Sequence, residues 1–219
     1  YKDRYTLPYT NASCDGGGVA VDRYGTPWVG FHDDRVVAKV DRSTGQVLEE
    51  ANIPGRVHGL VADRYDFIWA DEYQEKQITK IDALTGQVIA SYQPSDGLCF
   101  RPYGVAVDAR GRIWNSHDGA CPYITRFDPV TETFERFSAS NGSATLDRNR
   151  GIAADSQGLV WTVSSSKNKL AVFDVETGSH VSTHNTCNTP VGVALDRNNR
   201  VSISLLIDSP VFQRSMPNS

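Results

Sequence analysis

Histidines, acids and arginines gather in a few short segments of this 219-residue chain. Three of the five histidines lie there, with charged residues close by in sequence: His32, Asp33, Asp34, His58, Asp71, Glu72, Arg101, His117, Asp118 and Arg150. An imidazole titrates near neutral pH, so it can exchange a proton or bind a metal ion. The set predicts a site for acid–base chemistry or for a polar ligand, the plain alternative being polar loops that face water. We expect His32, Glu72, Arg101 and His117 to contact such a ligand.

The elements that must position these residues recur five times. Each repeat opens with a glycine, three small or β-branched apolar residues and an aspartate: Gly18–Asp22, Gly59–Asp63, Gly104–Asp108, Gly151–Asp155 and Gly192–Asp196. We call these the repeat glycines and repeat aspartates. Successive repeat glycines are 41, 45, 47 and 41 residues apart. A fixed period of this size indicates an array of similar structural units.

Tryptophan follows the same period. The four tryptophans of the chain each stand ten residues after a repeat glycine, at Trp28, Trp69, Trp114 and Trp161, and the fifth repeat has Ser202 there. A second turn motif follows each tryptophan, in Asp41–Gly45, Asp82–Gly86, Asp128–Glu132 and Asp174–Gly178. A large side chain required in every unit favours packing between neighbouring units over a role in binding.

Each repeat has the pattern of four short strands. The glycine segment is a continuous apolar run, typical of a strand buried on both faces, and a tight Asp-x-x-Gly turn follows in three repeats. Four strands in about 45 residues are typical of a β-propeller blade. We therefore predict an all-β, single-domain propeller of four-stranded antiparallel blades over residues 1–219. The blades span 14–53, 54–94, 99–138, 147–184 and 187–219, with an outer strand at 3–8.

Two closures fit this pattern. The strand at 3–8 could complete the fifth blade and close a five-bladed ring, which would remove the exposed sheet edges. The alternative is that the chain is part of a six- or seven-bladed parent.

The polar segments fall on one side of the predicted blades. Loops between the second and third strands, and between blades, share one end of a propeller, and here they vary in length and composition. They hold the residues described first, together with Phe31, Tyr73, Phe100 and Tyr103 as possible aromatic anchors. We call this end the loop-rich face. Variable loops on a rigid scaffold usually carry function.

The four cysteines indicate disulfides rather than a zinc site, because none forms a C-x-x-C pair. Cys99 precedes the third repeat and Cys121 lies in a loop of the same blade, so we predict a Cys99–Cys121 bond. A Cys14–Cys187 bond is expected only if five blades close a ring. Four unpaired thiols in a cytosolic protein are the alternative.

Composition and charge limit the classes of partner and the cellular location that we expect. The formal net charge is −4 and no run of basic residues could neutralise a row of phosphates, so nucleic acid is not expected. The longest apolar stretches have the length of strands, which excludes a membrane-spanning helix. We expect a secreted, periplasmic or cell-surface protein that binds a small molecule or a protein on its loop-rich face.

The repeat itself resembles a known group. Gly-Val-Ala-Val-Asp-x-x-Gly-x-x-Trp, followed by Arg-Phe-Asp-x-x-Thr, resembles the virginiamycin B (streptogramin) lyases and the wider NHL-type propellers over nearly the whole chain. One fold hosts many functions, so the resemblance specifies the fold more than the activity.

The resemblance also implies a catalytic alternative, a metal-assisted carbon–oxygen lyase. In those lyases a histidine just before an inner strand is the base, two glutamates of the following blade assist, and a divalent metal such as magnesium polarises the substrate. His58 matches the base and Asp118 approximates one glutamate, whereas Arg101 replaces the other with the opposite charge. A thinner resemblance, to peptidyl-amidating lyase propellers, groups His32, His58 and His117 as a zinc triad.

Overall fold

The computed structural model describes residues 16–96, 99–119, 121–139 and 146–206. These residues form strands joined by turns and loops, and there is no helix among them. The chain divides into two compact units, Tyr1–Ser95 and Asp96–Ser219, which we call unit 1 and unit 2 and describe separately.

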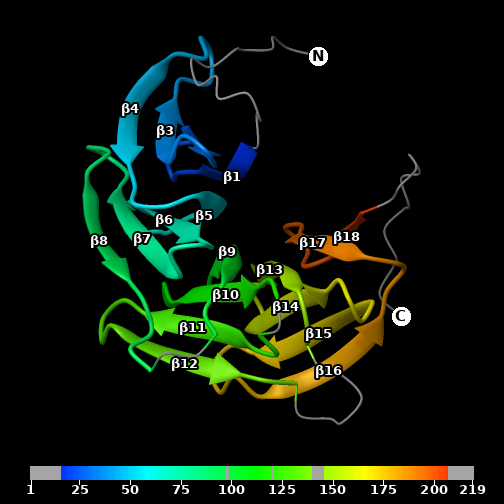
Figure 1. Ribbon diagram of the computed structural model, residues 1–219. Coiled ribbons are helices and arrows are strands. Elements are labelled where there is room, and N and C mark those ends of the chain that lie inside the picture. The colour runs from blue at the N-terminus through cyan, green and yellow to red at the C-terminus, as the bar shows by residue number, and fades with distance from the viewer. Residues whose placement is uncertain (1–15, 97–98, 120, 140–145, 207–219) are drawn as a thin grey trace. The chain divides into compact units, whose positions relative to one another are not determined.

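Unit 1 contains two antiparallel sheets of four strands, each in sequential order (Figure 1). The first sheet comprises β1 (Gly16–Val21), β2 (Pro27–Phe31), β3 (Val36–Val40) and β4 (Val47–Asn52). The second comprises β5 (Val57–Ala62), β6 (Phe67–Glu72), β7 (Gln77–Asp82) and β8 (Val88–Tyr92). The inner strands β1 and β5 lie side by side. Each sheet has the blade architecture that the repeat predicts.

Unit 2 contains two further four-stranded sheets and a two-stranded one. Their strands are β9 (Pro102–Val107), β10 (Ile113–His117), β11 (Ile124–Asp128) and β12 (Thr133–Phe137); β13 (Asn149–Ala154), β14 (Leu159–Ser164), β15 (Lys169–Asp174) and β16 (His180–Asn185); and β17 (Pro190–Leu195) with β18 (Val201–Leu205). Within the described residues the fifth repeat is therefore two-stranded. Its remainder at 207–219 and the predicted outer strand at 3–8 lie outside the described residues.

In the four repeats that contain a tryptophan, the repeat aspartate ties a turn to that tryptophan. One carboxylate oxygen of Asp63 accepts the backbone N–H groups of Tyr65 and Phe67, and the other accepts the indole N–H of Trp69 at 2.9 Å. The same indole bond forms in the other three repeats with tryptophan, Asp22–Trp28, Asp108–Trp114 and Asp155–Trp161. The recurrent spacing of aspartate and tryptophan thus satisfies a buried indole donor that would otherwise be costly.

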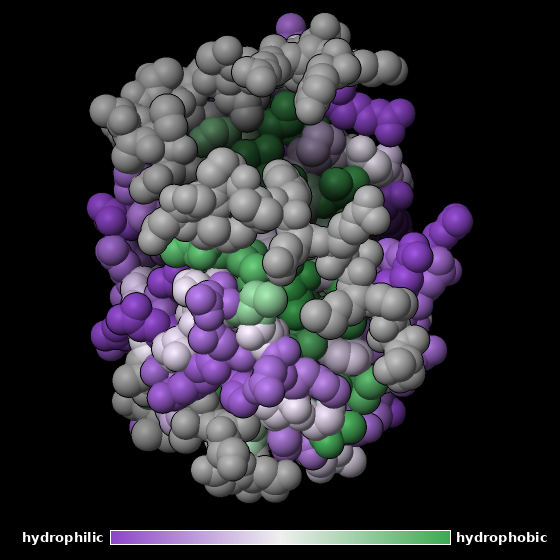
Figure 2. All heavy atoms as spheres, turned by 90° about the vertical axis from the view of Figure 1, so that its right-hand side faces the viewer, coloured by the Kyte–Doolittle hydropathy of each residue, from purple (hydrophilic) through white to green (hydrophobic). Residues whose placement is uncertain are grey.

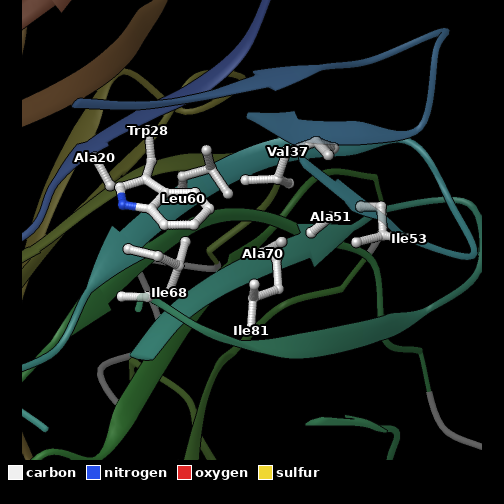
Figure 3. Packing of buried hydrophobic residues seen from close by; sticks show 11 residues of the cluster. Ala20, Trp28, Val37, Ala51, Ile53, Leu60, Ile68, Ala70 and Ile81 are labelled. Atoms are coloured by element: carbon white, nitrogen blue, oxygen red, sulfur yellow. The ribbon is translucent and has the colours of Figure 1, made fainter. Parts of the chain in front are cut away.

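Trp28 and Trp114 pack between blades, as the repeat predicts. Trp28 is fully buried, and its neighbours include Leu60 and Ile68 from the second blade (Figure 3). In unit 2, Trp114 belongs to a cluster with Ile152 and Phe173 of the following blade. Burying a large aromatic ring at each of these interfaces stabilises the stacking of blades.

The repeat glycines permit the inner strands to approach closely. A Cβ atom on Gly18 would lie 2.3 Å from the backbone nitrogen of Leu60, and one on Gly104 would lie 2.3 Å from the carbonyl oxygen of Arg150. Neither position could hold a larger residue without a backbone shift. The glycines therefore set the distance between neighbouring inner strands, and so the distance between the residues that flank them.

The first inner strand departs from the expectation that both faces are buried. Ala20 is buried, whereas Val19 and Val21 are 63% and 59% exposed. The cause is that the second blade covers one face of β1 only. Figure 2 shows both hydrophobic and hydrophilic residues at the surface of the described residues. Across the described segments, no helix has the length and hydrophobicity needed to span a membrane.

Candidate functional site

Two repeat-equivalent positions meet at the loop-rich face. One directly precedes each repeat glycine, and we call it the pre-glycine position; the other lies four residues after each tryptophan, and we call it the post-tryptophan position. The pre-glycine residues are Gly17, His58, Tyr103, Arg150 and Val191, and the post-tryptophan residues are His32, Tyr73, Asp118 and Ser165. In each unit the post-tryptophan residue of one blade contacts the pre-glycine residue of the next.

In unit 1 this contact joins two histidines. The Nε2 atoms of His32 and His58 are 3.1 Å apart, and the rings meet edge to face. The Nδ1 atom of His32 lies 3.0 Å from Oδ1 of Asp33, which in turn lies 3.6 Å from Nε of Arg56. Tyr73 packs against His58 with ring centroids 5.4 Å apart.

The hydrogen bonds define where the protons lie in this chain of groups. A carboxylate only accepts, so His32 donates its Nδ1–H to Asp33 and keeps a lone pair on Nε2. His58 must then donate its own Nε2–H to that lone pair. With both rings neutral, the carboxylate of Asp33 thus sets the tautomer of His32, and through it the tautomer of His58.

Two acids lie deeper in unit 1. Asp71 and Glu72 end β6, and both are fully buried. Burial, and next the charge of Glu72, raise the pKa of Asp71 well above its usual value. Burial also raises the pKa of Glu72, against hydrogen bonds from Thr79 and Gln77 that lower it. The predicted ligand-contacting residue Glu72 is thus packed inside its blade in this conformation.

In unit 2 the equivalent contact is an ion pair. Arg150 approaches Oδ2 of Asp118 at 3.3 Å, and its guanidinium lies 5.5 Å from the ring centre of Tyr103. The other oxygen of Asp118 accepts the backbone N–H of Gly119 at 2.9 Å. The backbone N–H of Asp118 donates to the carbonyl of Arg101, which links the two loops. Both oxygens of Asp118 are thus engaged.

His117, at the end of β10, is enclosed within unit 2. Its Nδ1 accepts the backbone N–H of Arg101 at 3.2 Å, so the proton resides on Nε2, which donates to Oγ1 of Thr125 at 3.1 Å. Phe100 and Tyr123 flank the ring. Burial lowers the pKa of His117 to about 3. The ring is therefore neutral at ordinary pH, and both its nitrogens bond within the unit.

A disulfide adjoins His117. It joins Cys99 to Cys121, the pair for which the sequence predicts a bond, with Cα atoms 5.7 Å apart. Tyr123 donates its hydroxyl to the carbonyl of Cys99, so one aromatic ring contacts both the disulfide segment and His117. Cys187 is exposed, and its predicted partner Cys14 lies outside the described residues.

The structure thus distributes the predicted site over the two units. His32 and His58 meet in unit 1, which also holds Glu72; Arg101, His117 and Asp118 meet in unit 2. Sequence reasoning did not select Asp33 as the partner of His32 or Arg150 as the partner of Asp118. Both pairs could have been identified in the sequence from their constant spacing: one partner follows the tryptophan by four residues, and the other directly precedes the repeat glycine.

The residues that the lyase resemblance assigns to magnesium do not fit the ion. Asp118 is held by Arg150 and by a backbone N–H, and Arg101 brings a positive charge. No group of three or more histidine, cysteine or acidic side chains that could hold a metal occurs in the described parts of the chain.

Fold and repeat together define the class, a β-propeller built of four-stranded blades. No protein-family model matches the sequence, and no curated protein is significantly similar to it. Solved structures with this fold include a streptogramin B lyase, with a TM-score of 0.74 and 18% identity over 87% of this chain and 62% of that one. Virginiamycin B lyase from Staphylococcus aureus has a TM-score of 0.72 and 15% identity over 92% and 73% of the two chains.

A third structure, the hydrazine synthase of Kuenenia stuttgartiensis, has a TM-score of 0.73 and 12% identity over 94% and 61% of the two chains. The predicted resemblance to the streptogramin lyases is therefore confirmed for the fold. The chain spans 62% of the length of the streptogramin B lyase.

Proposed function

We propose that this protein binds a small polar ligand on its loop-rich face, with the His32–His58 pair at the centre of the site. One observation carries the proposal: two imidazoles from neighbouring blades meet at 3.1 Å, braced by Asp33 and Arg56. The pair places two imidazole rings on rigid strand ends. Small-molecule sites usually place a few polar groups on a preformed scaffold in this way.

A small ligand is favoured over a protein partner by the surroundings of the pair. The side chain of His32 is 14% exposed, so it is recessed. Of the four residues expected as aromatic anchors for a protein, Phe100 of unit 2 is only 2% exposed, and the others are half-buried: Phe31, Tyr73 and Tyr103. Protein interfaces depend on accessible aromatic or arginine anchors. The disulfide supports a location outside the cytoplasm, either secreted, periplasmic or at the cell surface.

A thermal-shift screen of small polar compounds tests the proposal. A ligand at 100 times its Kd stabilises the folded state by about 2.7 kcal/mol, enough to raise the melting temperature visibly. We expect the shift to vanish in His32→Gln and His58→Gln and to persist in His184→Gln. His184 is a matched control because it is exposed and bonds only to Ser182 within the described residues. A shift that both pair variants retain would contradict the proposal.

A second candidate is a carbon–oxygen lyase reaction with His58 as base. The specific support is the position of His58 in the inner strand β5 of a fold shared with a streptogramin B lyase, together with the Asp33–His32 chain behind it. A proton taken up by His58 leaves an imidazolium whose Nε2–H donates to His32, and His32 donates to Asp33. A histidine base supported in this way suits proton removal.

Incubation with a streptogramin B antibiotic, with and without magnesium, tests this candidate by mass spectrometry. Elimination from the ring ester leaves the mass unchanged, so the linear product is identified by its chromatographic shift and its fragmentation. We expect the linear product with the wild-type chain and with His184→Gln, and none with His58→Gln. An absent product, or equal turnover by His58→Gln, rejects the lyase role without affecting the ligand screen.

A further inference from the structure

The facing imidazoles of unit 1 have the spacing of a metal chelate. Zinc binds imidazole nitrogens at 2.0–2.1 Å in tetrahedral geometry, which places two ligating nitrogens about 3.3 Å apart. The Nε2 atoms of His32 and His58 are 3.1 Å apart. An ion beside them would require a small outward movement of the two rings and a turn that directs both Nε2 lone pairs at the ion.

The neighbours of His32 prepare it to be a ligand. Its Nδ1–H is bonded to Asp33, so its Nε2 lone pair points to the space between the rings. A carboxylate behind a ligating histidine is the usual support in metal sites, because it sets the tautomer and raises the basicity of the ring. Arg56 lies beside Asp33, so the charge of that carboxylate is balanced.

The backbone supports both rings. His58 lies within β5, and His32 directly follows β2 in the adjacent blade. The close contact of Gly18 with Leu60 holds the two inner strands together at this level. The ligands are therefore largely preorganised, and the partial exposure of His32 leaves a path for an ion.

We propose that His32 and His58 bind one zinc-class divalent ion, with Asp33 as the supporting carboxylate. Two imidazole ligands favour zinc, copper or nickel over magnesium or calcium, which prefer oxygen. The tautomer of His58 shifts its proton from Nε2 to Nδ1 on binding. Two protein ligands leave coordination positions for water or for the ligand. His117 takes no part, because both its nitrogens bond inside unit 2.

This inference deepens the proposed ligand binding and rests on the same site, but zinc alone is its probe. Calorimetric titration of the whole chain with zinc chloride should show one site. His32→Gln and His58→Gln should each abolish it, Asp33→Asn should weaken it about 10-fold or more, and His184→Gln should leave it unchanged. Far-ultraviolet circular dichroism reports whether each variant is folded.

A second measurement needs no variant. Zinc should protect His32 and His58 of the wild-type chain from modification by diethyl pyrocarbonate, while His184 stays reactive, as read by peptide mass mapping. No binding heat, or zinc binding that both glutamine variants retain, overturns the proposal. A failure of zinc binding with an intact ligand shift in the thermal screen would reject the metal and keep the ligand site.

Discussion

The two units place different chemistry at equivalent positions. In unit 1 the post-tryptophan and pre-glycine residues are His32 and His58, whose nitrogens meet at 3.1 Å; in unit 2 they are Asp118 and Arg150, which form an ion pair at 3.3 Å. The backbone brings each pair together in the same way, through close inner strands. The repeat thus determines which residues meet, and the residue types alone determine what the contact can do.

The surroundings of the two contacts also differ. The histidine pair is supported from one side by Asp33 and is partly exposed. In unit 2 the oxygens of Asp118 are engaged, and next to them a disulfide and two aromatic rings enclose His117. Unit 1 therefore keeps ring nitrogens at an accessible site, whereas unit 2 uses its polar groups for its own structure.

Removing the disulfide should give the largest effect of the substitutions, confined to unit 2. The bond closes a loop with a sequence separation of 22, and Cys99→Ser with Cys121→Ser should cost about 3 kcal/mol of stability through a larger unfolded-state entropy. Urea unfolding followed by circular dichroism measures the loss. Zinc affinity in unit 1 should not change. A stability within 0.5 kcal/mol of the wild type, taking about that as the error, would show that the disulfide is not what holds this region.

Acid should destabilise unit 2 through His117. Its pKa is about 3 when folded and near 6.5 when unfolded, so the unfolded state binds more protons between these values. Stability should therefore fall as pH drops from about 6.5 towards 3, by up to about 1.4 kcal/mol per pH unit. His117→Gln lacks the titrating group and should show a shallower slope in urea midpoints over this range. Equal slopes for both proteins contradict the buried, neutral state of the ring.

Replacing the histidine pair of unit 1 by the ion pair of unit 2 should abolish zinc binding without disturbing the fold. His32→Asp with His58→Arg gives unit 1 the pair found in unit 2. We expect zinc binding to be lost while stability changes by about 1 kcal/mol or less, because partly exposed ion pairs contribute little. Calorimetry and thermal unfolding of the same sample measure the two quantities. Retained zinc binding would place the metal elsewhere.

The smallest effect should come from the Asp118–Arg150 pair itself. A double-mutant cycle with Asp118→Asn and Arg150→Gln should give a coupling energy of about 0.2–1 kcal/mol, because the pair is 3.3 Å apart and partly exposed. The matched cycle of Tyr103→Leu with Arg150→Gln isolates the stacking of the guanidinium on the ring. A coupling energy well above this range would show that the ion pair stabilises the fold more than a partly exposed pair usually does.

The repetitive part of the molecule was predictable because its signals are local. Glycine, aspartate and tryptophan recur at fixed offsets, and each has a role within one blade or its neighbour: close strand approach at Gly18, a turn and an indole bond at Asp63, interblade packing at Trp28. The Cys99–Cys121 bond was predictable because the repeat places both cysteines at loops of the same blade. The expected burial of both faces of β1 was wrong, because it depends on what covers the strand rather than on its residues.

The candidate site was only partly predictable, because residue type does not report burial. His32, His58 and His117 look alike in the sequence as loop-proximal histidines. In the structure two of them face each other, while the third is enclosed by Phe100 and Tyr123 with a strongly lowered pKa. Glu72 likewise reads as an exposed acid but is buried, with hydrogen bonds from Thr79 and Gln77.

The sequence by itself determined the blade, its turns, its packing residues and the end at which polar loops gather, since these depend on spacing along the chain. Only the tertiary structure decided which polar residues meet, which are buried and which nitrogens carry protons. Those properties depend on distances between blades and on exclusion of water, and both arise when residues distant in sequence pack together.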